Sequence, residues 1–163
     1  MGKGSSLKVG GKLQAAIARI NTVKNISMKV GVLDGATNPE TGEKIAPYAA
    51  ANEFGHMVRG GKYFVLPRPA FRNTIAAKSD SWGDGLSYQL ALKPISGESV
   101  KAALQLLGSV MVSDIQATIE AGEFAPLAPV TIAEKTKKGR AEPEKPMVDT
   151  GAYQRAIDYE IIE

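Results

Sequence analysis

The clearest pattern along the chain is an apolar stripe with helical spacing between residues 96 and 121. Residues at intervals of three and four lie on one side of an α-helix. Ser96 is a favoured residue for beginning a helix, and Gly122 is a favoured residue for ending one. We therefore expect a long helix over 97–121 that is the main packing element of the fold. The stripe consists of Val100, Leu104, Leu107, Met111, Ile115 and Ile119.

Two stretches instead alternate between apolar and polar residues, which predicts half-buried β-strands. The first is 27–33, where the apolar positions are Met28, Val30 and Val32. The second is 156–162, with Ile157, Tyr159 and Ile161 on one side. A short apolar run after two glycines predicts a third strand near 63–66. A loop after Asp34 suggests a hairpin in which 44–46 returns along the first strand.

The remaining helical patterns are shorter or weaker. We expect helices at 12–24 and 47–54, with Gly55 ending the second, and one or two helical turns near 131–138. Within 47–54, the apolar residues Tyr48, Ala51 and Phe54 would lie on the same side of the helix. The pattern over 71–92 contains Gly83 and Gly85, each of which costs a helix about 1 kcal/mol relative to Ala. We expect a kink or break near Gly83.

Together these elements predict an α+β fold: a small, mainly antiparallel sheet packed by the long helix and by shorter ones. The length of 163 residues favours one domain over 12–163, preceded by a flexible arm at 1–11 rich in Gly, Ser and Lys. The charged stretch 134–146 contains no apolar residue larger than alanine or proline. We expect it to be an exposed, flexible loop.

Composition removes several classes of function. With no cysteine and one histidine, His56, the chain has neither a disulfide framework nor the residues for a thiolate or multi-histidine metal site. We expect no metal and no cofactor. Apolar runs stay short of the roughly 20 residues of a membrane span, and the N-terminal lysines lack the apolar core of a signal peptide. The net charge of +3 permits contact with phosphate without requiring it.

The stretch from Tyr48 to Thr74 is the most distinctive. It contains Asn52-Glu53-Phe54-Gly55 and, after a short apolar run, Pro67-Arg68-Pro69. Prolines on both sides of Arg68 stiffen the backbone, and Pro69 suits the start of a helix. A preorganised guanidinium at such a corner loses little entropy on pairing, so we expect Arg68 to point outward toward a partner. Glu53 is a candidate to pair with Arg68 or Arg72.

Four short motifs, in this order, resemble the tailed-phage virion morphogenesis family, which includes the minor tail protein Z of lambda-like phages and related neck and tail-completion proteins. They span most of the chain, from about 28 to 162. The motifs are Ala51-Asn52-Glu53-Phe54-Gly55, Leu66-Pro67-Arg68-Pro69-Ala70-Phe71-Arg72, Leu127-Ala128-Pro129-Val130-Thr131-Ile132 and Val148-Asp149-Thr150-Gly151-Ala152.

The resemblance implies a structural virion protein that acts at the head–tail junction as part of a ring, without catalysis. A tail-side position suggests a hexamer whose lumen passes DNA and makes non-specific contact with it. The implied partners are further copies of the chain, connector or neck proteins, and tail terminator or tail tube proteins. The implied location is the virion, after assembly in the host cytoplasm. We predict the 1–11 arm and the 134–146 loop as docking segments.

Five residues are predicted near subunit contacts: Glu53, Phe54, Arg68, Phe71 and Arg72. The same residues could instead maintain the fold, with Phe54 and Phe71 in the core. Both alternatives stay open at the level of the sequence.

Two other functions have weaker support. The mildly basic charge is compatible with a nucleic-acid-binding module, although acidic residues dilute the lysines of 134–146. The run Val148-Asp149-Thr150-Gly151-Ala152 also resembles the active-site segment of retroviral-type aspartic proteases, in which two Asp carboxylates share one proton. Only 12 residues follow Gly151, and the chain is helix-rich where those proteases are nearly all β. A local structural role explains the same residues: Asp149 caps a short helix, and Gly151 allows a turn without strain.

Overall fold

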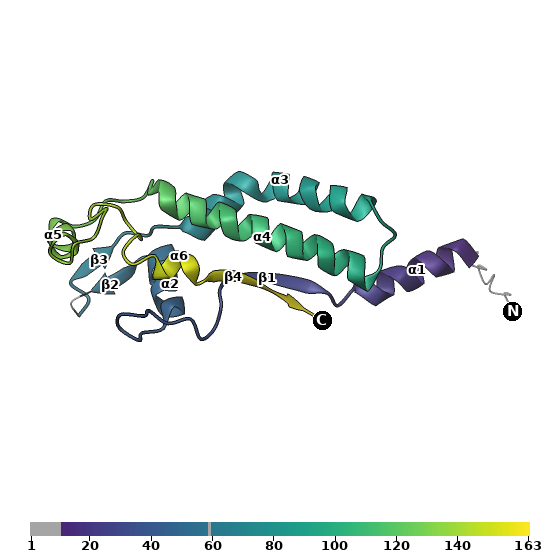
Figure 1. Cartoon of the computed structure of the whole chain (residues 1–163), viewed down its shortest axis with the longest axis horizontal. Helices are drawn as coiled ribbons and strands as arrows, with labels where there is room; N and C mark the ends of the chain where they lie inside the picture. The colour runs from purple at the N-terminus through teal and green to yellow at the C-terminus, as the bar shows by residue number, and fades with distance from the viewer. Residues whose placement is uncertain (1–10, 59) are drawn as a thin grey trace, which may run out of the picture.

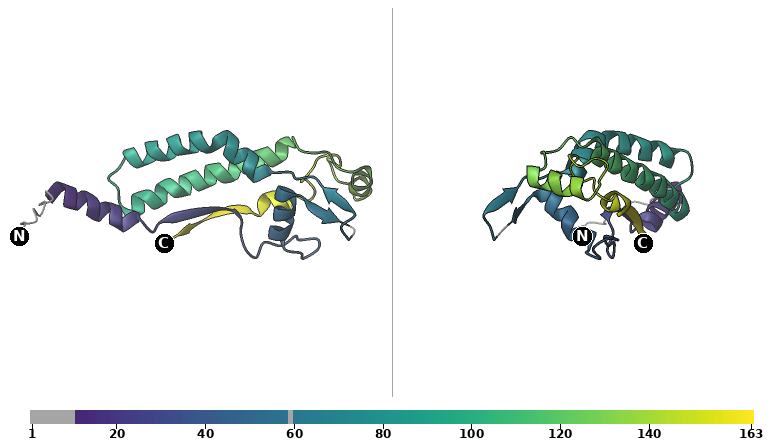
Figure 2. Two further views of the ribbon diagram at one scale, coloured as in Figure 1. Left: turned by 180° about the vertical axis from the view of Figure 1, so that it is seen from behind. Right: turned by 60° about the vertical axis from the view of Figure 1, so that its left-hand side comes forward.

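The computed structural model describes residues 11–58 and 60–163 and has an elongated α+β architecture (Figure 1). Two long helices, α3 (Ala70–Ala91) and α4 (Gly97–Ala121), lie side by side over a pair of strands. Helix α1 (Gly11–Val23) extends from one end of this body, and a small hairpin and helix α5 (Pro129–Lys137) lie at the other (Figure 2). The α+β prediction is confirmed. The predicted arm lies outside the described residues except for Gly11, which begins α1.

The two alternating stretches form the strand pair under α4. Strand β1 (Ser27–Val32) runs antiparallel to β4 (Ile157–Ile162), with Ser27 opposite Ile162 and Val32 opposite Ile157. This register places the apolar positions of both strands on one face, because side chains alternate along a strand. That face contacts α4. The strand predictions at 27–33 and 156–162 are therefore confirmed.

Helix α4 has the ends that its sequence predicts. The Ser96 hydroxyl accepts the Ser99 N–H at 3.1 Å, and the Ser99 hydroxyl accepts the Ser96 N–H at 2.9 Å, so that two helix-end donors are satisfied reciprocally. Gly122 ends the helix in the left-handed conformation, with φ of 70°. Along the stripe, Ile115 and Ile119 are completely enclosed in the core.

Close contact between α4 and the strands depends on Gly108. A Cβ atom at this position would lie 2.5 Å from Cγ of Tyr159 in β4 and 2.9 Å from Sδ of Met28 in β1. Both distances are shorter than any normal contact between such atoms. The helix approaches the sheet closely because position 108 has no side chain, a feature that the apolar stripe alone does not reveal.

Helix α4 is also long and apolar enough, by length and composition alone, to cross a membrane. It contains no uninterrupted apolar run of about 20 residues, because four charged residues lie within 97–121. In the fold, α4 packs on β1, β4 and α3, but part of its apolar surface, including Leu106 and Val110, remains exposed. Charged residues interrupt the helix, including Lys101, which pairs with Glu163, and Asp114.

The predicted break near Gly83 is wrong, because α3 runs from Ala70 to Ala91 as one helix. Contacts between α3 and α4 offset the weak helix propensity of this glycine. The indole N–H of Trp82 donates to Asp114 at 2.8 Å, and the Thr74 hydroxyl bonds that of Thr118 at 2.7 Å. Tertiary packing therefore outweighs the local preference.

The third predicted strand exists, but it is not part of the β1–β4 sheet. Strand β3 (Tyr63–Val65) pairs with a strand not expected from the sequence, β2 (His56–Val58), in a separate antiparallel hairpin. Gly60 and Gly61 both have positive φ and supply the turn, so the nearest available partner in the chain is the one that pairs. The other predicted hairpin is reduced to one bridge between Thr37 and Lys44, because Ile45 already begins a helix.

That helix is α2 (Ile45–Phe54), and it ends at Gly55 as predicted. Its buried side differs from the expected one. Phe54 and Tyr48 are 67% and 51% exposed, whereas Asn52 and Glu53 are buried. The alanines of α2 make its sides similar in hydrophobicity, so the polar partners described below decide which side turns inward. A short helix, α6 (Ala152–Arg155), packs beside α2 and precedes β4.

Candidate assembly surfaces

Glu53 supplies the cap of α3 from another helix. Residue Pro69 precedes α3 and has no side-chain oxygen, so it cannot cap the helix. One carboxylate oxygen of Glu53 accepts the Phe71 N–H at 3.1 Å, and the other accepts the Arg72 N–H at 3.0 Å. An anion at this position satisfies otherwise unpaired donors and interacts favourably with the helix dipole. The buried carboxylate of Glu53 therefore fixes α2 to α3.

Arg72 adds an ion pair to the same connection. Its Nε donates to the Glu53 carboxylate at 3.0 Å, and its Nη2 donates to the Glu53 carbonyl oxygen. The guanidinium carbon also lies 5.2 Å from the ring centroid of Phe54, a favourable cation–π arrangement. Of the two pairings considered for Glu53, the one with Arg72 is confirmed. Arg72 and Phe54 lie at the surface, where Arg72 restrains the exposed ring.

Arg68 points into the protein, so the prediction that it points outward is wrong. Its Nε donates to the carbonyl oxygen of Ala125 at 2.9 Å, and its Nη2 donates to that of Pro126 at 3.1 Å. Its own N–H donates to the carbonyl of Asn52 at 2.6 Å. Burial lowers the pKa of Arg68 from its ordinary value, and the guanidinium remains charged. The stiff Pro-Arg-Pro corner thus directs the side chain onto a distant backbone segment.

The charged loop is organised around Lys135. This lysine is buried, and its Nζ donates to the carbonyl oxygens of Glu142 at 3.3 Å, Lys145 at 2.7 Å and Val148 at 2.6 Å. Burial is also what lowers its pKa. Most of the 134–146 segment is exposed as expected, but it curls around an ammonium group. The expected flexibility of this segment stays a prediction.

Arg140 closes the same loop onto two carboxylates. It donates to both oxygens of Glu40, at 3.0 and 2.6 Å, and to Asp149 at 2.6 Å. The hydrogen bond with Arg140 lowers the pKa of the Glu40 carboxyl, and the pKa of Arg140 is raised in turn. The prediction that Asp149 caps a helix is wrong, since the Ala152 N–H donates to the Thr150 hydroxyl instead. Gly151 does adopt the expected turn, with φ of 73°.

These contacts link the four sequence motifs, either directly or through residues next to them. Glu53 of the first motif binds Phe71 and Arg72 of the second, and Arg68 of the second binds the two residues that precede the third. Lys135, in the helix that the third motif begins, binds Val148 of the fourth. The rings of Tyr48 and Tyr153 pack edge to face, with their centroids 5.9 Å apart, and this contact joins α2 to α6. We call this connected set of contacts the motif network.

The five predicted interface residues separate into two groups. Burial removes Glu53 and Arg68 from the accessible surface, and Phe71 is partly buried against the core. For these three the structure favours the fold-maintaining alternative. Phe54 and Arg72 lie at the surface, and for them an interface role stays a prediction.

The β2–β3 hairpin and the end of α2 carry exposed large apolar side chains. Met57 and Phe64 pair across the hairpin and share one face, whereas Tyr63, next to Phe64, points to the opposite face. Side chains of this size and type are normally buried, so a group of them indicates a contact surface. Sequence patterns predicted two of its elements, the helix at 47–54 and the strand at 63–66. We call the group formed by Phe54, Met57, Phe64 and Leu66, each more than half exposed, the hairpin patch.

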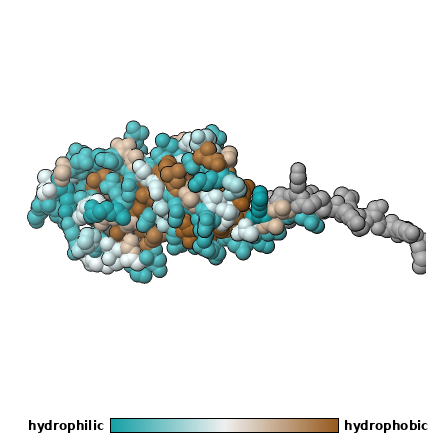
Figure 3. Space-filling view, turned by 45° about the vertical axis from the view of Figure 1, so that its right-hand side comes forward, coloured by the Kyte–Doolittle hydropathy of each residue, from teal (hydrophilic) through white to brown (hydrophobic). Residues whose placement is uncertain are grey.

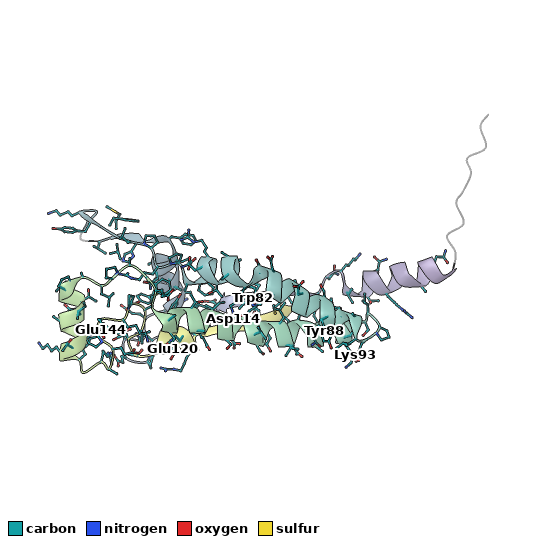
Figure 4. All side chains as sticks on the ribbon, turned by 90° about the horizontal axis from the view of Figure 1, so that it is seen from above. Trp82, Tyr88, Lys93, Asp114, Glu120 and Glu144 are labelled. Carbon is teal, nitrogen blue, oxygen red and sulfur yellow. The ribbon has the colours of Figure 1, made fainter. Side chains whose placement is uncertain are left out.

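A second uncovered apolar surface is a groove of about 400 Å³ between α3 and α4, which we call the helix groove. Seen from above in Figure 4, it lies along the middle of the body, where Trp82 and Asp114 meet. Leu106 and Val110 on its α4 side are 50% and 44% exposed. Figure 3 shows apolar residues gathered on the body of the molecule, with polar regions around them. Its apolar lining is Trp82, Leu86, Ala103, Leu106, Leu107 and Val110.

The β1–β4 pair provides a third surface. Within the described part of the chain it is a sheet of two strands, so each strand has one unpaired edge six residues long. Unpaired N–H and C=O groups along such an edge can pair with a strand from another molecule. A shallow groove follows the β1 edge from Lys29 to Asp34.

The described residues hold no cluster of three or more metal-binding side chains. Ring atom Nδ1 of His56 lies 3.3 Å from the carbonyl oxygen of Ala51, a local contact. A cavity of about 190 Å³ beside α6 is lined by Tyr48, Met147 and Tyr153. Burial raises the pKa of the Tyr153 phenol, so this hydroxyl stays protonated and is poorly suited to proton transfer. The Asp149 carboxylate is occupied by Arg140, which does not favour the proton-sharing pair of an aspartic protease.

Comparisons with family models, curated proteins and solved structures gave no match to this chain.

Proposed function

We propose that this chain is a structural virion protein of a tailed bacteriophage, a neck or tail-completion component that acts at the head–tail junction as part of a ring. The observation that carries the proposal is the motif network. The four motifs of the resemblance are up to about a hundred residues apart in sequence. Buried Glu53 of the first motif nevertheless binds the second, and buried Arg68 of the second binds the two residues just before the third. Buried Lys135, three residues after the third motif, binds Val148 of the fourth. The motifs, or residues next to them, therefore belong to one connected part of the fold, which supports treating the resemblance as a whole.

Assembly into a ring is supported by what the fold leaves uncovered. Both edges of the β1–β4 sheet are free in the described chain, and two apolar surfaces lie open to solvent. A single subunit gains nothing from such surfaces and risks non-specific association. Contacts between different surfaces of identical subunits close into rings when the rotation between subunits permits.

In this proposal the chain works by contact and carries out no reaction. Its partners are further copies of itself, the connector or neck proteins on the head side, and the tail terminator or tail tube on the other, with a hexamer as the expected ring. The lumen passes DNA. In the 134–146 loop, Lys135, Arg140 and Lys145 already bind groups of the same chain. These ties weaken the alternative of a dedicated nucleic-acid-binding module.

The proposal is tested by measuring the mass of the purified protein by light scattering, alone and with tails and connectors from its source. We expect a ring of defined mass, and electron micrographs that show it at the end of tails to which it was added. A protein that remains monomeric, joins neither component, and binds DNA with a steep dependence on salt would favour the nucleic-acid alternative.

A further inference from the structure

We propose that the hairpin patch of one subunit docks into the helix groove of a second copy of the chain. This inference rests on the proposed ring, and it identifies two of the surfaces that meet in it. It requires that the patch be large enough for a stable contact, that the groove suit an apolar occupant, and that a second copy be the occupant.

The patch has about the apolar area that a stable interface needs. Aromatic side chains bury roughly 150–250 Å² each when fully enclosed. At exposures between 55% and 67%, the four members offer on the order of 100 Å² each, and about 400 Å² together. A typical partner surface loses about 800 Å², of which a little over half is apolar. The hairpin patch therefore provides about the apolar part of one side of a standard interface.

The groove has the chemistry of a receptor for such side chains. Its floor and sides are aliphatic and indole groups, and its volume of about 400 Å³ falls in the range of sites that enclose a bound group. The two charged groups in its lining, Lys78 and Asp114, are paired with each other at 3.5 Å, and Asp114 also accepts the Trp82 indole N–H. A neutral apolar occupant leaves these charges satisfied, whereas a charged one would have to displace them.

A second copy is the occupant because both surfaces occur in one chain but cannot meet within it. The hairpin projects at the end of the molecule that carries α5 (Figure 1), whereas the groove lies along the middle of the α3–α4 pair (Figure 4). Docking a protruding patch of one subunit into a hollow of the next is a heterologous contact. Repetition of that contact gives a closed ring or an open helix, in agreement with the proposed assembly.

The contact can be tested directly, since the natural chain contains no cysteine. Phe64→Cys places one thiol on the hairpin patch, and Leu106→Cys places one in the groove. A short bismaleimide reagent should join the two variants into a dimer when they are mixed, and should join neither variant to itself. Matched controls are Ala133→Cys on α5 near the hairpin and Ser109→Cys on α4 outside the groove, both exposed. Mixtures that contain a control should stay unlinked.

A second measurement uses variants without thiols. Phe64→Ser and Leu106→Ser should each weaken self-association at least about tenfold, because truncated anchor residues at the centre of an interface commonly cost that much. Both residues are exposed in the single chain, so thermal unfolding of the monomer should stay close to that of the parent protein. Ala133→Ser is the matched control and should associate normally.

The outcomes separate this inference from the proposed ring. Rings that form normally while Phe64→Cys and Leu106→Cys stay unlinked would overturn the inference and leave the proposed function standing. Self-linking of Phe64→Cys alone would also overturn it, because two patches would then face each other. Linked mixtures that give only open filaments would support the docking contact and contradict the ring.

A membrane is the other surface that an exposed apolar patch could enter, and it is tested separately. A fluorophore attached to the thiol of Phe64→Cys is mixed with phosphatidylcholine vesicles that contain spin-labelled lipid. Docking between subunits predicts no quenching of the fluorophore by these vesicles. Strong quenching, together with unlinked mixtures in the bismaleimide experiment, would overturn the inference in favour of a lipid surface.

Discussion

The two halves of this molecule are held together by different interactions. In the body, α4 packs on β1, β4 and α3 mainly through apolar side chains, with a few hydrogen bonds to α3, and complementary shape matters, as the missing side chain of Gly108 illustrates. At the opposite end, the motif network uses Glu53, Arg68 and Lys135, three buried charged groups whose partners include backbone N–H and C=O groups.

The difference explains which substitutions each half should tolerate. Aliphatic packing responds to volume, so that one methyl group too many or too few is costly but conservative exchanges are accepted. A buried charge responds to the loss of its partners, because an unsatisfied ion or amide incurs the full penalty of leaving water. Four predictions test this contrast.

The largest effect is expected for Glu53→Ala. It leaves the N–H groups of Phe71 and Arg72 and the Arg72 guanidinium without their acceptor, so we expect the free energy of unfolding to fall by about 3 kcal/mol. Urea denaturation measures it. Glu53→Gln keeps one acceptor and should lose less. The control is Glu120→Ala, an exposed carboxylate at the end of α4, which should change stability little. Equal losses for Glu53→Ala and Glu120→Ala would contradict a buried polar connection.

Gly108→Ala should have the next largest effect. The added methyl would collide with Tyr159 and Met28, a form of overpacking that costs about 1–3 kcal/mol, and the better helix propensity of Ala returns only part of it. We expect a net loss of about 1–2 kcal/mol in the free energy of unfolding. An increase in stability would show that α4 does not approach the strands so closely.

The same exchange in α3 should act in the opposite direction. In the described structure a Cβ at Gly83 meets nothing within 4 Å. Gly83→Ala should therefore raise the free energy of unfolding by about 0.5–1 kcal/mol through helix propensity. Measured beside Gly108→Ala, it separates packing from propensity with one chemical change. A loss at both positions would mean that α3 is interrupted at Gly83 after all.

The smallest effect concerns pH and the Arg140 loop closure. Because Arg140 lowers the pKa of Glu40, the stabilisation is present above the ordinary carboxyl pKa of 4.5 and is lost as the pH falls through the folded value. Glu40→Gln should therefore melt slightly below the parent protein at neutral pH, and the difference should disappear in acid. A difference in melting temperature that persists unchanged at about pH 3 would argue against this carboxylate as its source.

Patterns along the chain predicted the body well. The α4 stripe, its Ser96 and Gly122 ends and the alternating strands need only neighbouring residues, because helix and strand periodicities are local. The helix through Gly83 was missed because its stability comes from α4, a partner that local propensity does not contain. Local patterns also failed to predict the orientations of Tyr48, Phe54 and Arg68, because these too depend on contacts with other segments of the chain.

Patterns among neighbouring residues were enough to establish the α+β class, the positions of most helices and strands, and the four motifs on which the proposed function depends. They did not reveal that those motifs are linked directly or through neighbouring residues, that Arg68 and Lys135 turn inward, or that β3 pairs with β2, all of which appear only in the folded chain. The reason is physical. Periodicity depends on residues that are close together in the sequence. A buried charge is stable only where hydrogen-bonding partners from distant segments surround it, and those segments come together only on folding.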